Sequence, residues 1–187
     1  MHIEPQAIPE VVAFTPKRIG DARGYFSEVF RRDLFATHCP GVDFVQDNQS
    51  LSAEAGTLRG LHFQAPPAAQ AKLIRVLAGA ILDVAVDIRA GSPTFGRHVA
   101  LKLDAATGTQ LYIPTGFAHG FCTLEPHTLI HYKVSAYYSA AHDRGLAFDD
   151  PALAIAWPVA AAKATLSGKD RTHPKLAELS ACFTYAA

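Results

Sequence analysis

The stretch Ile81-Leu-Asp-Val-Ala-Val-Asp-Ile88 alternates strictly between two kinds of side chain. One set of alternate positions holds the aliphatic residues Leu82, Val84, Val86 and Ile88, and the other set holds Asp83, Ala85 and Asp87. Because successive side chains of a β-strand point to opposite faces, a period of two predicts a strand here. Residues 99–103 and 128–134 alternate in the same way, so the chain is predicted to contain several short strands.

Helical signals are weak in comparison. The 13 glycines and 12 prolines are spread along the chain and divide it into short pieces, and only residues 31–38 and 174–179 favour short helices. Many short strands without intervening helices indicate an antiparallel sandwich or barrel. We therefore predict a single all-β domain over residues 1–187, with short peripheral and C-terminal helices.

The composition argues against several classes of partner. Hydrophobic residues make up 49% of the 187 residues and charged residues 18%, with 17 basic and 17 acidic side chains. The hydrophobic share argues against disorder, and the low charge favours a surface that is buried in an oligomer. The balanced charge provides no field that would attract nucleic acid or an anionic membrane.

The sequence predicts a cytoplasmic location. Residues 1–10 have neither the basic start nor the apolar core of a signal peptide, and the apolar stretch 152–162 is too short to span a bilayer. The cysteines Cys39, Cys122 and Cys182 are far apart and form no CxxC pair. We therefore expect no disulfide framework and a reducing compartment.

The segment Gly108-Thr-Gln-Leu-Tyr-Ile-Pro114-Thr-Gly116-Phe-Ala-His119 fits the pattern G-x5-P-x-G-x2-H. This pattern resembles the second motif of the cupin jelly roll, in which a turn leads into a strand whose histidine points into the barrel. The first cupin motif would supply His-x-His and then a Glu, but this chain has His62-Phe-Gln64 and no Glu before Arg75. Two histidines are too few for a metal site, and the ammonium of Lys72 would repel a divalent cation. We therefore expect a cupin-type jelly roll without a metal.

A more specific resemblance covers nearly the whole chain, from about Pro9 to Pro174. The motifs that carry it are Asp21-Ala-Arg23-Gly-Tyr-Phe26-Ser-Glu28, Gln46-Asp-Asn-Gln-Ser50, Gly56-Thr-Leu-Arg59-Gly-Leu-His62-Phe-Gln64, Gln70-Ala-Lys72-Leu, Asp83-Val-Ala-Val-Asp87-Ile-Arg89, Ser92-Pro-Thr-Phe-Gly96, Ile113-Pro-Thr-Gly-Phe-Ala-His119-Gly-Phe121 and Leu166-Ser-Gly-Lys169-Asp170. In this order they resemble the dTDP-4-dehydrorhamnose 3,5-epimerase family of deoxysugar biosynthesis.

The resemblance implies a nucleotide-diphosphate keto-sugar as substrate. The protons on C3 and C5 of such a sugar are both alpha to its C4 ketone. Inversion removes a proton from one face and returns a proton to the other face through an enolate. This chemistry requires a base, an acid on the opposite face and a cation or donor at the ketone oxygen. It requires no redox cofactor and no metal, so we expect none.

Four residues match the catalytic positions of the family. His62 is the candidate base, because an imidazole pKa near 6.5 suits proton abstraction at about neutral pH. Asp170 resembles the carboxylate that orients this histidine and stabilises its protonated form. Lys72 is expected to stabilise the enolate oxygen, and Tyr132 resembles the acid on the far face of the sugar.

Further matches are expected to bind the substrate. Arg59 resembles the arginine that binds the diphosphate, since a guanidinium pairs well with phosphate oxygens. The resemblance also implies a homodimer in which the neighbouring subunit supplies nucleotide contacts from its N-terminal strands, where Arg23, Phe26 and Glu28 lie. The remaining expected contacts are Gln46, Asp47, Asn48, His119, Tyr138, Asp143 and Lys169.

Two features fit less smoothly. Strict alternation places Arg59 and His62 on opposite faces of one strand, so either Gly60 hosts a bulge or the two residues approach the substrate from different directions. The family commonly has Glu-Arg-Gly where this chain has Asp143-Arg144-Gly145, and the shorter carboxylate changes that contact.

Three other functions remain open from the sequence. A related epimerase that inverts only C3 or only C5 would share the same residues. A metal-dependent cupin is disfavoured by the missing ligands. A non-catalytic sugar-nucleotide-binding module is disfavoured by the complete set of base, acid and enolate stabiliser.

Overall fold

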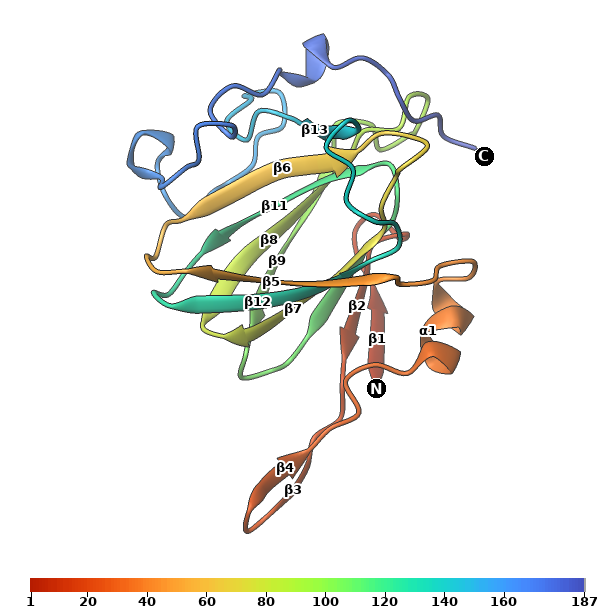
Figure 1. The fold of residues 1–187 in the computed structure, drawn as a ribbon, viewed down its shortest axis with the longest axis vertical. Helices are drawn as coiled ribbons and strands as arrows, with labels where there is room; N and C mark the ends of the chain where they lie inside the picture. Colours follow the sequence, from red (N-terminus) through yellow and green to blue (C-terminus); the bar gives the residue numbers. More distant parts are fainter. Residues whose placement is uncertain (187) are drawn as a thin grey trace.

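The computed structural model describes residues 1–186 and is built mainly from two antiparallel sheets that face one another (Figure 1). The first sheet has the order β1-β2-β10-β7-β12-β5, with β1 His2–Pro5, β2 Val12–Thr15, β10 Gln110–Ile113, β7 Lys72–Ala78, β12 Thr128–Val134 and β5 Gln46–Ser52. The second has the order β13-β6-β11-β8-β9, with β13 Asp143–Gly145, β6 Leu58–Gln64, β11 Phe117–Thr123, β8 Ala80–Asp87 and β9 His98–Asp104. This arrangement confirms the predicted all-β fold of the jelly-roll type.

The strand that alternates most clearly in the sequence, β8, lies inside the second sheet and is buried on both faces. On one face Ile81 and Ala85 join the core between the two sheets. On the other face Val84 and Val86 pack against residues from the C-terminal part of the chain. The face that carries Asp83 and Asp87 therefore points toward the interior, where each carboxylate must find a partner.

Helices are short and peripheral. Helix α1, Arg32–His38, packs Phe35 against the outer face of the first sheet, as the sequence predicts. The segment 174–179 forms only a 3-10 turn, η2 Leu176–Glu178, and another turn, η1 Ala161–Lys163, is not expected from the sequence. Among the described residues, no helix has the length and the apolar character needed to cross a membrane.

Strand β6 contains a bulge at Gly60. Its residue His62 is paired with His119 of β11, whereas Arg59 is paired with Phe121, so β6 uses three steps where β11 uses two. Gly60 has a φ of +122°, and a Cβ at this position would lie 2.5 Å from the Cα of Gly120. A glycine is therefore required at this close approach of two backbones. The bulge brings Arg59 and His62 to the same side of the sheet, which settles the alternative that the sequence leaves open.

The N-terminal hairpin, formed by β3 Ile19–Asp21 and β4 Gly24–Phe26, extends away from the two sheets (Figure 1). Its large apolar side chains are exposed, with 60% of Ile19 and 66% of Phe26 accessible to solvent. A two-stranded ribbon without a packed face is marginal in water. The hairpin therefore presents an apolar surface that this chain leaves uncovered.

Candidate active site

A cleft opens between the two sheets. Its inner part is a cavity of about 270 Å³ lined by Ser50, Arg59, His62, Lys72, His119, Phe121, Ile130, Tyr132, Ser167 and Asp170. Its outer part is a cavity of about 390 Å³ lined by Gln46, Asn48, His62, Phe63, Gln64, Gln70, Lys72, Tyr132, Tyr138, Asp143 and Lys169. His62, Lys72 and Tyr132 border both cavities, so they lie where the inner and outer parts meet.

His62 on β6 is held by Asp170. Its Nε2 lies 2.6 Å from Oδ1 of Asp170, whose other oxygen accepts a hydrogen bond of 2.7 Å from the Ser167 hydroxyl. Burial by itself would raise the pKa of Asp170, but the hydrogen bonds from His62 and Ser167 outweigh it and lower the pKa. The carboxylate therefore stays charged and fixes the orientation of the imidazole ring. Nδ1 of His62 is the ring nitrogen that remains available as a base.

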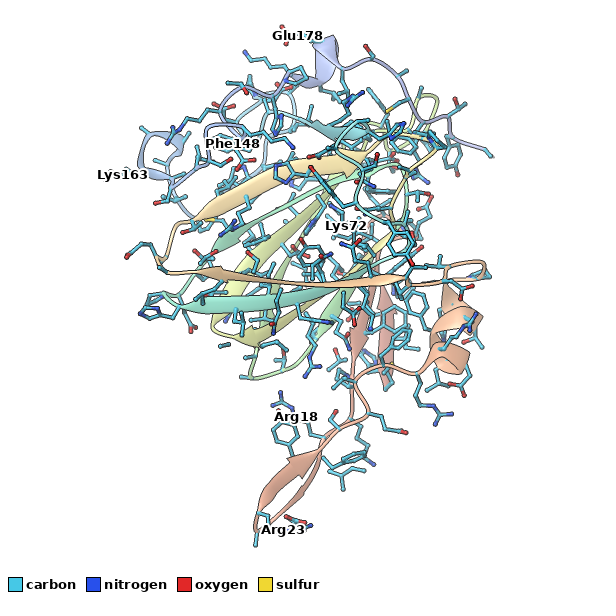
Figure 2. The ribbon with its side chains drawn as sticks, in the orientation of Figure 1. Arg18, Arg23, Lys72, Phe148, Lys163 and Glu178 are labelled. Carbon is cyan, nitrogen blue, oxygen red and sulfur yellow. The ribbon has the colours of Figure 1, made fainter. Side chains whose placement is uncertain are left out.

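Lys72 begins β7 and is buried in the centre of the molecule, far from the N-terminal hairpin (Figure 2). Its Nζ donates a hydrogen bond of 3.2 Å to the backbone oxygen of His62. Burial lowers the pKa of Lys72 to about 8, against the opposing attraction of Asp83 and Asp143. Lys72 thus places a positive charge in a desolvated cleft beside His62, where it interacts strongly with a developing anion.

Tyr132 lies on β12 of the first sheet, whereas His62 lies on β6 of the second. The two side chains therefore enter the cleft from opposite walls. Burial raises the pKa of Tyr132, which keeps its hydroxyl protonated and able to act as an acid. His62 and Tyr132 therefore face the same cavities from different sheets, an arrangement suited to proton transfer on two faces of one ligand.

A second histidine pair lies deeper in the cleft. Nε2 of His119 on β11 is 2.7 Å from Oδ1 of Asp83 on β8, and both side chains are buried. Burial lowers the pKa of His119, despite the nearby Asp83 carboxylate. Asp83 points into the interior because alternate side chains of β8 face the core, and there it is the hydrogen-bond partner of His119.

Polar side chains at the cleft mouth are joined by hydrogen bonds. Gln46 on β5 donates to the Asn48 side chain at 2.8 Å and accepts from the backbone nitrogen of Tyr138 at 3.1 Å. The Tyr138 hydroxyl donates to Asp143 at 3.1 Å, and the ammonium of Lys169 contacts the same carboxylate. Asp143 therefore reaches its neighbours despite being shorter than the usual Glu.

Arg59 lines the inner part of the cleft and donates hydrogen bonds to Ser52 and to the backbone oxygen of Leu51. Its position beside His62, made possible by the bulge at Gly60, leaves a guanidinium at the edge of the cavity. A guanidinium at this edge is suited to a phosphate group.

One expected substrate contact is placed elsewhere. The Asp47 side chain is exposed on the outer face of β5, where Lys133 donates to it at 3.0 Å. Gln46 and Asn48, the neighbours of Asp47, point into the cleft because side chains alternate along the strand. Asp47 does not line the cleft of its own chain, and its contact with the substrate stays a prediction.

The three expected N-terminal contacts also lie outside this cleft. Arg23 is at the tip of the β3–β4 hairpin (Figure 2), with its side chain 89% exposed. Phe26 is exposed on the same hairpin, and Glu28, which follows it, lies 3.9 Å from Arg31. None of the three borders the cleft of the chain that carries them.

Sequence reasoning missed two residues that contact the His62–Asp170 pair. Ser167 is the hydrogen-bond donor to Asp170, and it precedes Asp170 by three residues. His173 follows Asp170 by three residues, and its ring meets the ring of His62 edge-on at 5.4 Å between centroids. A turn in which Thr172 donates its backbone N–H to Lys169 brings His173 back toward the pair. The i, i+3 spacing around Asp170 is the signal that could have found both residues.

Fold and site together define a cupin-like jelly-roll protein with an acid–base site between its sheets. A family model described as dTDP-4-dehydrorhamnose 3,5-epimerase matches residues 5–178, and the chain belongs to this family. A dTDP-4-dehydrorhamnose 3,5-epimerase from Sinorhizobium fredii is 53% identical over 185 residues, which cover 99% of this chain and 94% of the relative.

Solved structures agree with this assignment. The structure of a dTDP-6-deoxy-D-glucose-3,5-epimerase from Legionella pneumophila in complex with dTDP-4-keto-L-rhamnose has a TM-score of 0.93 and 40% identity, and the match covers 100% of both chains. A 3'-monoepimerase from Streptomyces bikiniensis in complex with dTDP-quinovose has a TM-score of 0.86 and 36% identity, covering 95% of this chain and 88% of that one.

Proposed function

We propose that the protein is an isomerase that inverts C3 and C5 of dTDP-4-dehydro-6-deoxy-glucose and gives dTDP-4-dehydro-rhamnose. The observation that carries this proposal is the hydrogen-bonded pair of His62 and Asp170, which shares one cleft with Lys72 and, on the opposite wall, Tyr132. The 53% identity to a dTDP-4-dehydrorhamnose 3,5-epimerase supports the same substrate.

In the proposed reaction His62 removes the proton from the carbon beside the ketone, and Asp170 stabilises the imidazolium that forms. The electron pair of the broken C–H bond moves into the enolate, whose oxygen is stabilised by the ammonium of Lys72. Tyr132 then donates a proton to the opposite face of the same carbon. After the first inversion the imidazolium of His62 gives its proton to water and the phenolate of Tyr132 takes one from water. Repeating the sequence at the second carbon then gives the doubly inverted product. Only protons are transferred between the substrate and the side chains of His62 and Tyr132, so the proposed reaction needs neither a metal nor a redox cofactor.

The substrate is proposed to lie with its sugar in the inner part of the cleft and its diphosphate near Arg59. The polar side chains of Gln46, Asn48 and Lys169 at the mouth, with the aromatic ring of Tyr138, would then meet the nucleotide. His119 would contact the sugar from the interior.

We further propose that the chain is one domain that functions as a homodimer in the cytoplasm. The exposed apolar side chains of the β3–β4 hairpin support the dimer, because a second copy would cover them. In this arrangement Arg23, Phe26 and Glu28 serve the cleft of the partner subunit. The free state of Cys39, Cys122 and Cys182 is compatible with a reducing compartment.

The test of the activity is an NMR experiment in heavy water with dTDP-4-keto-6-deoxyglucose. Exchange and inversion are followed separately at C3 and at C5 after the enzyme has been treated exhaustively with a chelator. Inversion at both carbons supports the proposal. Inversion at one carbon alone would identify a monoepimerase, and activity that disappears with the chelator and returns with one particular metal would contradict the metal-free mechanism.

A further inference from the structure

His173 has an unusual environment for a histidine that lies beside a catalytic pair. Its side chain is 8% exposed, and its Nε2 is buried without a hydrogen-bond partner. The ring of His173 packs directly against Gly145. A Cβ at position 145 would lie 2.2 Å from the ring, so only glycine leaves room for it. A buried ring nitrogen without a partner is costly, so the placement of His173 requires an explanation beyond packing.

The nitrogen points toward Asp170. Nε2 of His173 is 3.7 Å from Oδ1 of Asp170, which is too long for a hydrogen bond. Two ligand atoms that bind one tetrahedral Zn²⁺ at about 2.0–2.2 Å are separated by about 3.4 Å. The spacing of His173 and Asp170 is thus close to that of two ligands of one metal ion, whereas His62 and Asp170, which are 2.6 Å apart in their hydrogen bond, must separate by about 1 Å when the ion binds.

His62 completes a set of three ligands. One donor atom each from His62, Asp170 and His173 lies within 4.8 Å of the other two. We propose that these three side chains form a binding site for a divalent transition metal such as Zn²⁺, which inhibits the enzyme when it is bound. Two imidazoles and one carboxylate are a frequent ligand set for zinc, with water at the fourth position.

The metal is expected to inhibit because it takes the place of the hydrogen bond between His62 and Asp170. Zinc would bind Nε2 of His62, so the single proton of the neutral ring would sit on Nδ1. Nδ1 could then no longer accept a proton from the sugar. The inhibitory effect, but not the binding, rests on the proposed role of His62 as the base. The site is therefore compatible with turnover that needs no metal.

Two cavities give access to this position. His173 borders a cavity of about 480 Å³ together with Phe63, Gly145 and Cys182, and it also borders a cavity of about 490 Å³ that Asp170 lines as well. The two lysines nearest the pair are engaged by other groups. Lys72 is bonded to the His62 backbone oxygen, and Lys169 contacts Asp143. The cavity of about 490 Å³ gives a cation access to both Asp170 and His173.

The test uses Co²⁺ as a spectroscopic probe of the full-length, metal-free enzyme. Bound Co²⁺ in a tetrahedral site of this kind gives an intense visible absorption, and added Zn²⁺ should displace it at one equivalent per chain. His173→Asn should weaken Zn²⁺ binding by at least about 10-fold, measured by competition and by calorimetry. The matched control is His127→Asn, which replaces an exposed histidine in the turn between β11 and β12 and should leave the affinity unchanged.

Inhibition is measured on the same samples. Zn²⁺ should inhibit the wild-type enzyme and the His127→Asn variant at the concentration that displaces Co²⁺, and a chelator should restore their activity. His173→Gln, compared by thermal unfolding, provides a second variant if the Asn form is not folded. Unchanged zinc affinity in folded His173 variants would overturn the proposal. If Zn²⁺ binds tightly and its binding depends on His173, but turnover is unaffected, the result would support the metal site and contradict the assignment of His62 as the base.

Discussion

At the scale of single residues, the opposite placement of His62 and Tyr132 makes their roles separable. Tyr132→Phe retains the ring and removes only the hydroxyl, so His62 still forms the enolate and can return solvent deuterium to the same face. We expect exchange at C3 and C5 to continue while inversion falls by about 100-fold or more. The measurement is the ratio of deuterium exchange to product formation, observed by NMR.

His62→Ala is the companion variant, and it should abolish exchange at both carbons because no enolate forms. Lys72→Ala should slow exchange and inversion together, since the enolate that it stabilises precedes both. If the ratio of exchange to inversion in Tyr132→Phe equals that of the wild type, Tyr132 is not the acid.

The depressed pKa of Lys72 predicts a specific pH dependence. The ammonium form stabilises the enolate, and this form is lost as the pH rises through the pKa of about 8. We therefore expect kcat/KM to fall on the alkaline side with an apparent pKa near 8, which is a property of the free enzyme. Lys72→Gln removes the titrating group, so its residual activity should show no such fall. An alkaline limb that is the same in both proteins would assign the titration to another group.

At the scale of secondary structure, the bulge in β6 sets the relation between Arg59 and His62. Gly60→Ala would bring a Cβ within 2.8 Å of the His119 backbone oxygen as well as against Gly120. Since neither backbone can move freely, we expect a loss of about 1–3 kcal/mol in the free energy of unfolding, measured by urea denaturation. Gly168→Ala is the control, because a Cβ at Gly168 meets no atom within 4 Å. Equal stabilities of the two variants would show that β6 tolerates a side chain at the bulge.

The same strand shows how far the sequence predicts the site. Alternating apolar residues predict the strands well, because burial of one face fixes which residues point inward. Alternation fails at Gly60, because the extra residue of the bulge changes which face of β6 the following side chains point to. Only the close steric fit of Gly60 against Gly120 determines that the bulge lies there. It also accounts for Asp47, which lies on the outer face of its strand beside Lys133 while Gln46 and Asn48 line the cleft. His173 was missed because its i, i+3 spacing from Asp170 becomes a contact only through a turn and through the missing side chain at Gly145, which strand alternation does not reveal.

At the scale of the whole molecule, the dimer predicts that two inactive subunits can restore one another. Arg23→Ala removes a side chain from the hairpin, and His62→Ala inactivates the cleft. In a mixed dimer, the Arg23→Ala subunit keeps His62 and receives an intact hairpin from its partner. Random mixing should therefore recover about a quarter of the wild-type activity, measured after the two variants are unfolded and refolded together. Recovery that stays at the level of the separate variants would contradict shared sites.

The uncovered hairpin has a consequence for how the protein responds to heat. If Ile19, Tyr25 and Phe26 are covered only when two chains associate, part of the free energy of unfolding comes from dimerisation. That part depends on the protein concentration. The melting temperature should then rise with protein concentration. It should fall on dilution until the chains separate. A cell that makes little of this protein would hold it closer to unfolding than a cell that makes much, although every chain has the same sequence.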